Sequence, residues 1–174
     1  MDRETQTRPE ILVRPASWPA DQAAALLLLR RYADYLAAIP TGGPPIEIHG
    51  YDGERANLAR TWAEPHGVLL LAFVAGEPAG CVAVNARIDG QCEMKRLWVE
   101  THLRGHSLGR TLVFAAMTWS RARNAPALLL DTLPAAMPEA GALYRSLGFV
   151  EVERHNDNPV AGLQFLRCDL PALP

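Results

Sequence analysis

The chain has 174 residues, of which 49% are hydrophobic and 21% are charged, and its formal net charge is -2. This length suits one well-cored domain, so we expect a single domain over residues 1–174. The composition argues against a basic nucleic-acid binder, and the longest apolar run, residues 23–29, is far shorter than the ~20 residues of a membrane-spanning helix.

The N-terminal segment and the cysteines indicate where the protein works. Residues 1–10 are polar, and no apolar run with a small-residue cleavage site follows them promptly. Cys81, Cys92 and Cys168 are odd in number and widely spaced, which favours neither a disulfide framework nor a zinc site. We therefore expect a cytoplasmic protein with reduced thiols, no metal, and no nucleic-acid or membrane partner.

The first third of the chain is predicted to be mainly helical. Ser17, Pro19 and Asp21 are start signals for a helix, and Tyr32 and Tyr35 lie on its apolar face. In chain order we expect a strand at residues 10–14, this helix to about residue 39, a loop rich in glycine and proline that continues to residue 53, and a second helix at residues 54–64.

A segment rich in strands begins at residue 67. If Asp89-Gly90 forms a two-residue turn, Ala86 faces Glu93 and Cys81 faces Trp98, a register that keeps Cys81 and Cys92 apart. The apolar runs predict strands at residues 68–75, 80–88 and 91–99, joined by turns at residues 76–77 and 89–90.

The remainder alternates between helices and strands. Gly148 stands where a helix C-terminus favours glycine. The pattern predicts a helix at residues 108–123, a buried strand at 127–132, a helix at 138–147, and strands at 149–153 and 163–170. A meander followed by β-α-β-α-β-β predicts an α/β (α+β mixed) fold with a mixed sheet and helices on both faces.

The loop between the strand at 91–99 and the next helix is the most informative segment. Free N–H groups and the dipole at a helix start bind phosphate, glycines admit a ligand close to the backbone, and arginines add charge-assisted hydrogen bonds. The loop lacks the third glycine of a Rossmann motif and the Gly-Lys-Ser/Thr of a Walker A motif, and an ordinary strand–helix connection is the alternative. Its residues are Arg104, Gly105, His106, Ser107, Leu108, Gly109 and Arg110.

Three segments, in order, resemble the Gcn5-related N-acetyltransferase superfamily. Residues 104–109 match its Arg/Gln-x-x-Gly-x-Gly/Ala signature, with Ser107 in place of the usual middle glycine. Residues 142–149, Ala-Leu-Tyr-Arg-Ser-Leu-Gly-Phe, are similar to its Leu-Tyr-x-x-x-Gly-Phe segment, and residues 92–99 look like its fourth strand. The resemblance covers about residues 67–170.

The resemblance implies a mostly antiparallel sheet of about seven strands flanked by about four helices, with the fourth and fifth strands splayed apart. It also implies acetyl-CoA as co-substrate. The pyrophosphate would bind residues 104–110, and the pantetheine would pair with the backbone of Leu97, Trp98 and Val99 and contact Thr132. The family's asparagine seven residues before the tyrosine is replaced by Met137, so that contact is not assigned.

Acetyl transfer to an amine needs a base for the acceptor and an acid for the leaving thiolate. The resemblance places Tyr144 at the general-acid position, although its spacing also fits a packing role in the helix. Glu93 is the candidate base, directly or through water, and a structural pairing with Lys95 or Arg96 is the alternative. The implied activity is transfer of an acetyl group to the amine of a small-molecule or amino-acid-like acceptor.

The resemblance implies an acceptor pocket built from the first two helices, their loop and the last strands. Arg30, Tyr35 and Asn158 are the candidate acceptor ligands, and a solvated helix face is the alternative for the first two. A catalytically silent CoA-binding sensor is a second hypothesis, motivated by Ser107 and Met137. Because many relatives pair, a homodimer is a further expectation.

Overall fold

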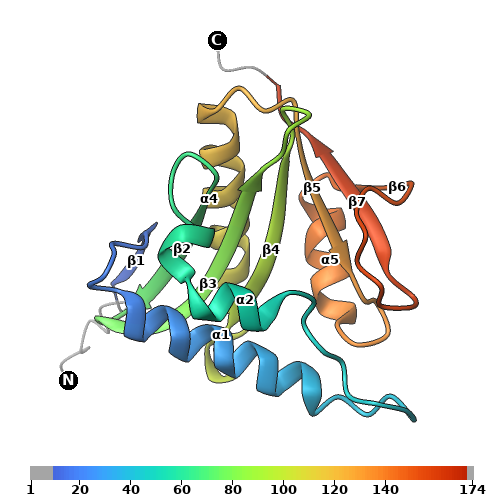
Figure 1. The fold of residues 1–174 in the computed structure, drawn as a ribbon, viewed down its shortest axis with the longest axis horizontal. Helices are drawn as coiled ribbons and strands as arrows, with labels where there is room; N and C mark the ends of the chain where they lie inside the picture. Colours follow the sequence, from blue (N-terminus) through green and yellow to red (C-terminus); the bar gives the residue numbers. More distant parts are fainter. Residues whose placement is uncertain (1–9, 172–174) are drawn as a thin grey trace, which may run out of the picture.

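The computed structural model describes residues 10–171, so most of the polar segment at residues 1–10 lies outside the described part. Its seven-stranded sheet has the order β1-β2-β3-β4-β5-β7-β6 (Figure 1). Neighbouring strands pair antiparallel, except β4 and β5, which are parallel. The elements are β1 (Ile11–Pro15), α1 (Gln22–Ala37), α2 (Tyr51–Ala56), α3 (Leu58–Thr61), β2 (Gly67–Val74), β3 (Glu77–Ala86), β4 (Cys92–Val99), the 3-10 helix η1 (Thr101–Leu103), α4 (Leu108–Ala122), β5 (Ala127–Thr132), α5 (Pro138–Ser146), β6 (Val150–Val152) and β7 (Gln164–Asp169).

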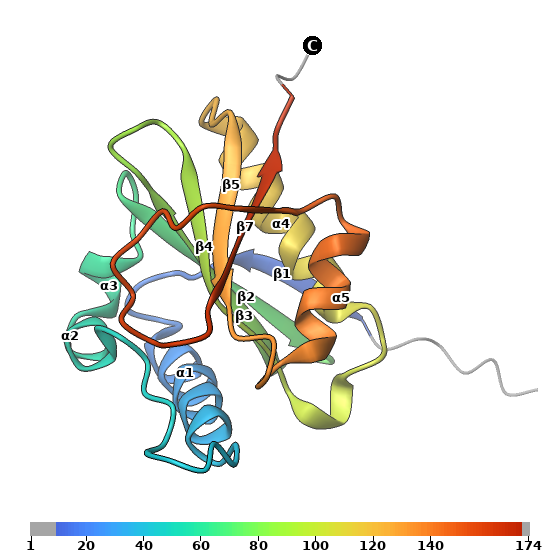
Figure 2. The ribbon, with the colours of Figure 1, turned by 90° about the vertical axis from the view of Figure 1, so that its right-hand side faces the viewer.

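Helices cover both faces of this sheet, as predicted (Figure 2). On the face of α1, α2 and α3, Leu29 belongs to one buried cluster with Leu71 of β2. On the face of α4 and α5, Leu112 belongs to a second cluster with Val84 of β3. Burying one such side chain stabilises the fold by about 1.5–3 kcal/mol. Because both faces of the central strands are buried, these strands are continuous apolar runs in the sequence.

The strands β4 and β5 separate along their length, which confirms the predicted splay. They pair only at Cys92 with Leu128 and at Glu93 with Leu129. Figure 1 shows the two strands diverging toward the side of α1. Beyond Glu93, β4 keeps β3 as its strand partner on one edge. Its other edge is therefore free to pair with an extended ligand.

The β3–β4 hairpin differs from the expected register at its tip. Ala86 faces Cys92 rather than Glu93, because Arg87 N–H bonds to Gln91 O and the loop between them has three residues instead of two. Farther along, Cys81 does face Trp98, as predicted.

A β-bulge in β4 restores the predicted pairing of Cys81 with Trp98. The register shifts between Cys81 and Ala83 on β3, and Arg96, which has a positive φ of 59°, lies opposite this shift. The bulge also reverses which face the alternate residues point to. Met94 packs in the cluster beneath α4, whereas Trp98 packs beneath α1. The last residues of β4 are thus turned relative to the first ones.

The second helix starts earlier than expected and is interrupted. It begins at Tyr51 rather than at residue 54, and Asn57, with φ -151° and ψ 61°, separates α2 from α3. The expectation of one continuous helix over residues 54–64 was therefore wrong. Non-helical backbone at Asn57 leaves two short pieces, and tertiary contacts rather than helix propensity hold them in place.

A buried ion pair joins α2 to the bulge of β4. Arg96 donates from Nε to Glu54 Oε2 at 2.9 Å and from a terminal nitrogen to His49 O at 3.1 Å. Trp62 Nε1 donates to the other oxygen of Glu54 at 2.9 Å. The Glu54 side chain is only 4% exposed and that of Arg96 14%. This clamp fixes the bulge from the α2 side.

Neutralising the clamp is expected to destabilise the fold. Glu54→Gln should lower the free energy of unfolding by about 3 kcal/mol, because it leaves the Arg96 guanidinium charged and buried without its counter-ion. Urea unfolding followed by circular dichroism measures the change. Asp52→Asn is the matched control on the same helix, since Asp52 is 92% exposed and should matter little. Equal effects for both variants would refute the clamp.

Candidate active site

A cleft of about 500 Å³ lies where β4 leaves β5, between the start of α4 and α5. Its walls bring together residues from β4, from the loop before α4 and from α5. Most of the predicted cofactor-binding residues line this cleft. They are Leu97, Trp98, Val99, Arg104, Gly105, Ser107, Leu108, Gly109 and Arg110, and Tyr35, Met137, Ala140 and Leu143 line it too.

The loop before α4 has the backbone of an anion cradle. Gly105 and Ser107 both adopt positive φ, 81° and 64°, which turns the chain sharply into the helix. The first helical bond there runs from Thr111 N–H to Ser107 O. The amides that precede Thr111 therefore stay available to a ligand at the positive end of the helix dipole. His106 contributes little beyond its backbone, because its ring is exposed and its Nδ1 donates to Arg104 O at 3.0 Å.

Ser107 adopts a left-handed conformation that suits glycine. This conformation costs an L-residue about 1–2 kcal/mol, so Ser107 keeps the shape of the loop but lowers the stability of the fold. Ser107→Gly should raise the free energy of unfolding by about 0.5–1 kcal/mol after the greater freedom of glycine in the unfolded chain is counted. Chemical denaturation tests this. The control Ser120→Gly, in the interior of α4, should instead lower the free energy of unfolding. A Ser107→Gly variant less stable than the wild type would contradict the backbone strain at Ser107.

The cleft has open space beside Gly109. A Cβ at Gly109 would lie 3.4 Å from Leu143 Cδ2 and 3.8 Å from Val99 Cγ2, so glycine leaves this space for a ligand. Arg110 lines the same space and donates to Ser146 Oγ at 2.8 Å. Amides, open space and a cation thus meet at one point, an arrangement that suits an anionic ligand.

Arg104 lies differently from a simple phosphate ligand. Its guanidinium lies over the rings of Tyr35 and Trp98, at 4.6 and 4.8 Å from their centroids, and its Nε donates to Val99 O at 3.3 Å. Trp98 Nε1 beneath it is buried without a hydrogen-bond partner among residues 10–171. Arg104 thus joins α1 to the end of β4 at the mouth of the cleft.

Tyr144 lies in α5, buried beside the splayed strands. Its ring packs on Phe149 at a centroid distance of 5.7 Å, so the packing role is real. Burial, Tyr32 and Asp131 raise the pKa of its hydroxyl, and burial raises the pKa of the Tyr32 hydroxyl to about 12. Tyr32 belongs to α1 on the opposite face of the sheet, so its influence on Tyr144 acts across the gap between β4 and β5. Both hydroxyls stay protonated at neutral pH.

Thr132, the predicted pantetheine contact, is the last residue of β5 and pairs with Gln164 of β7. It is 3% exposed, and its Oγ1 has no hydrogen-bond partner within the described residues. It does not line the 500 Å³ cleft. The structure therefore does not bring the Thr132 side chain into the cleft with the other predicted cofactor ligands.

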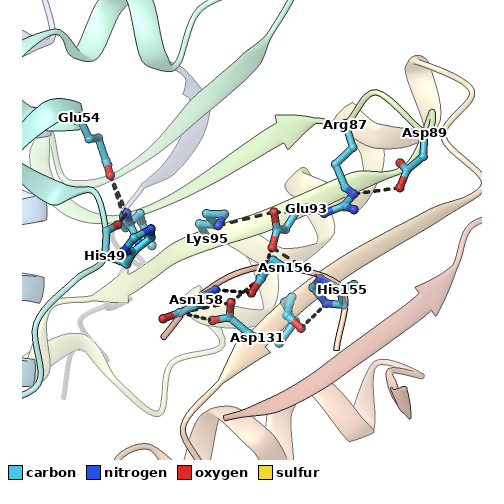
Figure 3. A network of polar contacts seen from close by, with 12 residues as sticks. His49, Glu54, Arg87, Asp89, Glu93, Lys95, Asp131, His155, Asn156 and Asn158 are labelled. Atoms are coloured by element: carbon cyan, nitrogen blue, oxygen red, sulfur yellow. Dashed lines mark hydrogen bonds and ion pairs between the residues drawn. The ribbon is translucent and has the colours of Figure 1, made fainter. Parts of the chain in front are cut away.

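Glu93 is buried in a polar network on the α1 side of the sheet (Figure 3). Its carboxylate accepts from Asn156 Nδ2 at 2.6 Å and lies 3.5 Å from Lys95 Nζ and 3.7 Å from an Arg87 nitrogen. The predicted pairing with Lys95 is present, whereas Arg96 binds Glu54 instead. His155 Nε2 donates to Leu130 O at 3.1 Å, and its Nδ1 lies 3.7 Å from Glu93 Oε1.

Two residues of this network were missed by reasoning from the sequence. Asp131 accepts from Asn156 Nδ2 at 2.6 Å and from Asn158 Nδ2 at 3.4 Å, so Asn156 joins Asp131 to Glu93. A polar residue at the end of an apolar strand was the available signal for Asp131. The sequence neighbours of Asn156 gave no sign that its side-chain amide would contact Glu93 of β4 and Asp131 of β5.

Two further cavities lie on the acceptor side. A cavity of about 130 Å³ is lined by Tyr32, His49, Met94, Lys95, Arg96, Asp131, Asn156, Asp157 and Asn158. A groove of about 1270 Å³ runs between the loop after α1, residues 133–136 and residues 159–161. Of the predicted acceptor ligands, Asn158 lines the small cavity and Tyr35 lines the cleft. Arg30 lines neither of them, and its side chain is 78% exposed with Nε 3.8 Å from Asp34 Oδ2.

Within the part of the chain that the structure describes, no helix is long and apolar enough to cross a membrane. In that same part, no group of three or more His, Cys, Asp or Glu side chains is arranged to hold a metal ion.

Comparisons with known proteins agree with this geometry. The model of the acetyltransferase (GNAT) family matches residues 33–149. An uncharacterized N-acetyltransferase of Schizosaccharomyces pombe is 36% identical over 130 residues, which are 74% of this chain and 79% of that protein. N-acetylaspartate synthetase of Danio rerio is 29% identical over 112 residues, covering 63% of this chain and 39% of that protein. The solved structure of PaiA N-acetyltransferase of Thermoplasma acidophilum in complex with coenzyme A has a TM-score of 0.70 at 15% identity, covering 92% of this chain and 99% of that chain.

Proposed function

The chain belongs to the acetyltransferase (GNAT) family, and from this premise we propose that it is a single-domain, acetyl-CoA-dependent N-acetyltransferase acting on the amine of a small molecule or amino-acid-like acceptor. The observation that carries the proposal is the continuous cleft from the free amides before α4 to the splayed edge of β4. The cleft combines an anion cradle with a backbone edge, and acetyl-CoA has a pyrophosphate at one end and an amide-containing arm at the other.

In this proposal, different residues of the chain bind different parts of acetyl-CoA, which supplies the acetyl group as a thioester. Amides of residues 105–110 and Arg110 bind the pyrophosphate. The free edge of Leu97, Trp98 and Val99 pairs with the pantetheine amides. An N–H on this edge, held in place by the bulge, lies where negative charge develops on the acyl oxygen during attack.

We assign proton transfer to Tyr144 and Glu93. Burial keeps the Tyr144 phenol protonated, so it can donate a proton to the departing thiolate. Glu93 contacts Asn156, which lines the small cavity, but Glu93 itself does not line that cavity. It would therefore accept the proton of the acceptor amine through a water molecule rather than directly.

Two observations support a small acceptor. The cavity between β4 and β5 holds about 130 Å³, which suits an amino group and its neighbouring carbons rather than a bulky substrate. The wider groove beside it accommodates the rest of the molecule. The similarity to N-acetylaspartate synthetase favours acceptors related to amino acids.

Incubating the full chain with acetyl-CoA and a panel of amines and amino acids tests this function. We expect thiol release that depends on the acceptor, and an N-acetylated product by mass spectrometry. Calorimetry with CoA alone separates the alternatives. CoA binding without turnover over the whole panel would support the silent sensor, and the absence of CoA binding would contradict both functions.

A further inference from the structure

The two carboxylates of the splayed region differ in their counter-ions. Glu93 lies within 4 Å of the cationic groups of Lys95 and Arg87 and of the His155 ring. Asp131, on the other strand, forms no ion pair with any residue among 10–171. Its charge is therefore left uncompensated by the described part of the protein.

Two asparagine side chains nonetheless hold Asp131 in place. Asn156 Nδ2 donates to Asp131 Oδ2 at 2.6 Å, and the same nitrogen lies 2.6 Å from Glu93 Oε1. An amide carries two hydrogens, so it can donate one to each carboxylate. Asn158 Nδ2 lies 3.4 Å from both oxygens of Asp131. These amide groups are neutral, so they hold the carboxylate without supplying a counter-ion.

The position of Asp131 is that of an acceptor ligand. It lines the small cavity together with Met94, Lys95 and Arg96 of β4, and the cleft continues along the next residues of that strand. The cationic groups of the same cavity are already engaged, since Lys95 faces Glu93 and Arg96 binds Glu54. Tyr32 lines this cavity as well, so a ligand bound by Asp131 would lie beside that tyrosine.

We propose that Asp131 binds the acceptor as an ammonium cation, with Asn156 and Asn158 as positioning residues that hold its carboxylate toward the cavity. The inference rests on the proposed function and narrows the acceptors to amines that are protonated when they bind. A neutral amide or alcohol of the same shape would leave Asp131 without its counter-ion, a loss that costs affinity in a partly buried site.

Binding measurements test the proposal without requiring turnover. Calorimetry on the CoA-bound full chain should show that the protein binds n-butylammonium chloride at least about tenfold more tightly than 1-butanol, the neutral alcohol with the same number of heavy atoms. Asp131→Asn should weaken n-butylammonium binding by at least about tenfold, while CoA affinity and the melting temperature stay close to those of the wild type. Asp131→Glu, which keeps the charge, should retain part of the affinity.

Asp169→Asn is the control, because Asp169 of β7 has a side chain that is 79% exposed and does not line this cavity. It should change n-butylammonium binding by no more than about twofold, since water screens its charge. Equal binding of the ammonium and the alcohol, no binding of n-butylammonium, or equal effects of the two asparagine variants would overturn the proposal. If n-butylammonium binds in a manner that depends on Asp131 but no amine is acetylated, the proposed function alone is contradicted. If Asp131→Asn turns over its amine with an unchanged KM, this inference alone is contradicted.

Discussion

Tyr144→Phe is expected to lower kcat by about 10²–10⁴-fold while leaving the KM for acetyl-CoA nearly unchanged, because it removes the proton for the leaving thiolate and keeps the ring. The packing of the ring on Phe149 does not need the hydroxyl, so the variant should fold. Steady-state kinetics with the best acceptor of the amine panel measures the effect.

The raised pKa of Tyr144 adds a prediction about pH. A phenol whose pKa is raised above its ordinary value stays protonated through the neutral range, so the wild-type rate should not fall between pH 7 and pH 9 because of this residue. A Tyr144→Phe variant as fast as the wild type would remove Tyr144 from the acid role.

Gly109→Asp is expected to raise the Kd for CoA by about 100-fold. Its carboxylate would project into the cleft beside the free amides of the loop, where it would occupy the space of the diphosphate and repel it. The Cβ alone meets Leu143 at 3.4 Å, a contact that a small shift of the leucine relieves. Isothermal calorimetry with CoA gives the change in Kd.

Two variants separate shape from charge in this experiment. Gly109→Ala adds the methyl group alone and should weaken CoA binding far less than the aspartate does. Gly43→Asp places the same charge where a Cβ meets nothing within 4 Å, in the loop after α1, and should leave the Kd for CoA unchanged. If Gly109→Asp also left the Kd unchanged, the loop before α4 would not be the pyrophosphate site.

The features predicted from the sequence are those with local causes. The start of α4, the turn of the loop before it and the end of α5 at Gly148 each follow from residues within a few positions of one another. The family resemblance then supplied the splay of β4 and β5. The break of α2 at Asn57 was missed because short helices owe their ends to tertiary packing rather than to propensity.

The polar network around Glu93 could not be predicted from the sequence. Asn156 lies 63 residues from Glu93 and 25 from Asp131 along the chain, yet its one amide group reaches both. Arg104 likewise matches a phosphate-loop motif by position, and only the fold reveals that its guanidinium rests on Tyr35 and Trp98. Such contacts depend on which segments the topology brings together, and no local pattern encodes them.

The bulge at Arg96 makes β4 sensitive to residue count in one place and tolerant in another. Losing one residue from the loop between Arg87 and Gln91 would shorten a turn and preserve the pairing of Ala86 with Cys92. Losing one residue at Arg96 would exchange the two faces of Leu97, Trp98 and Val99, sending Trp98 toward α4 and away from α1. We therefore expect natural variation in length at the hairpin tip but not at Arg96, even though both lie on the same hairpin.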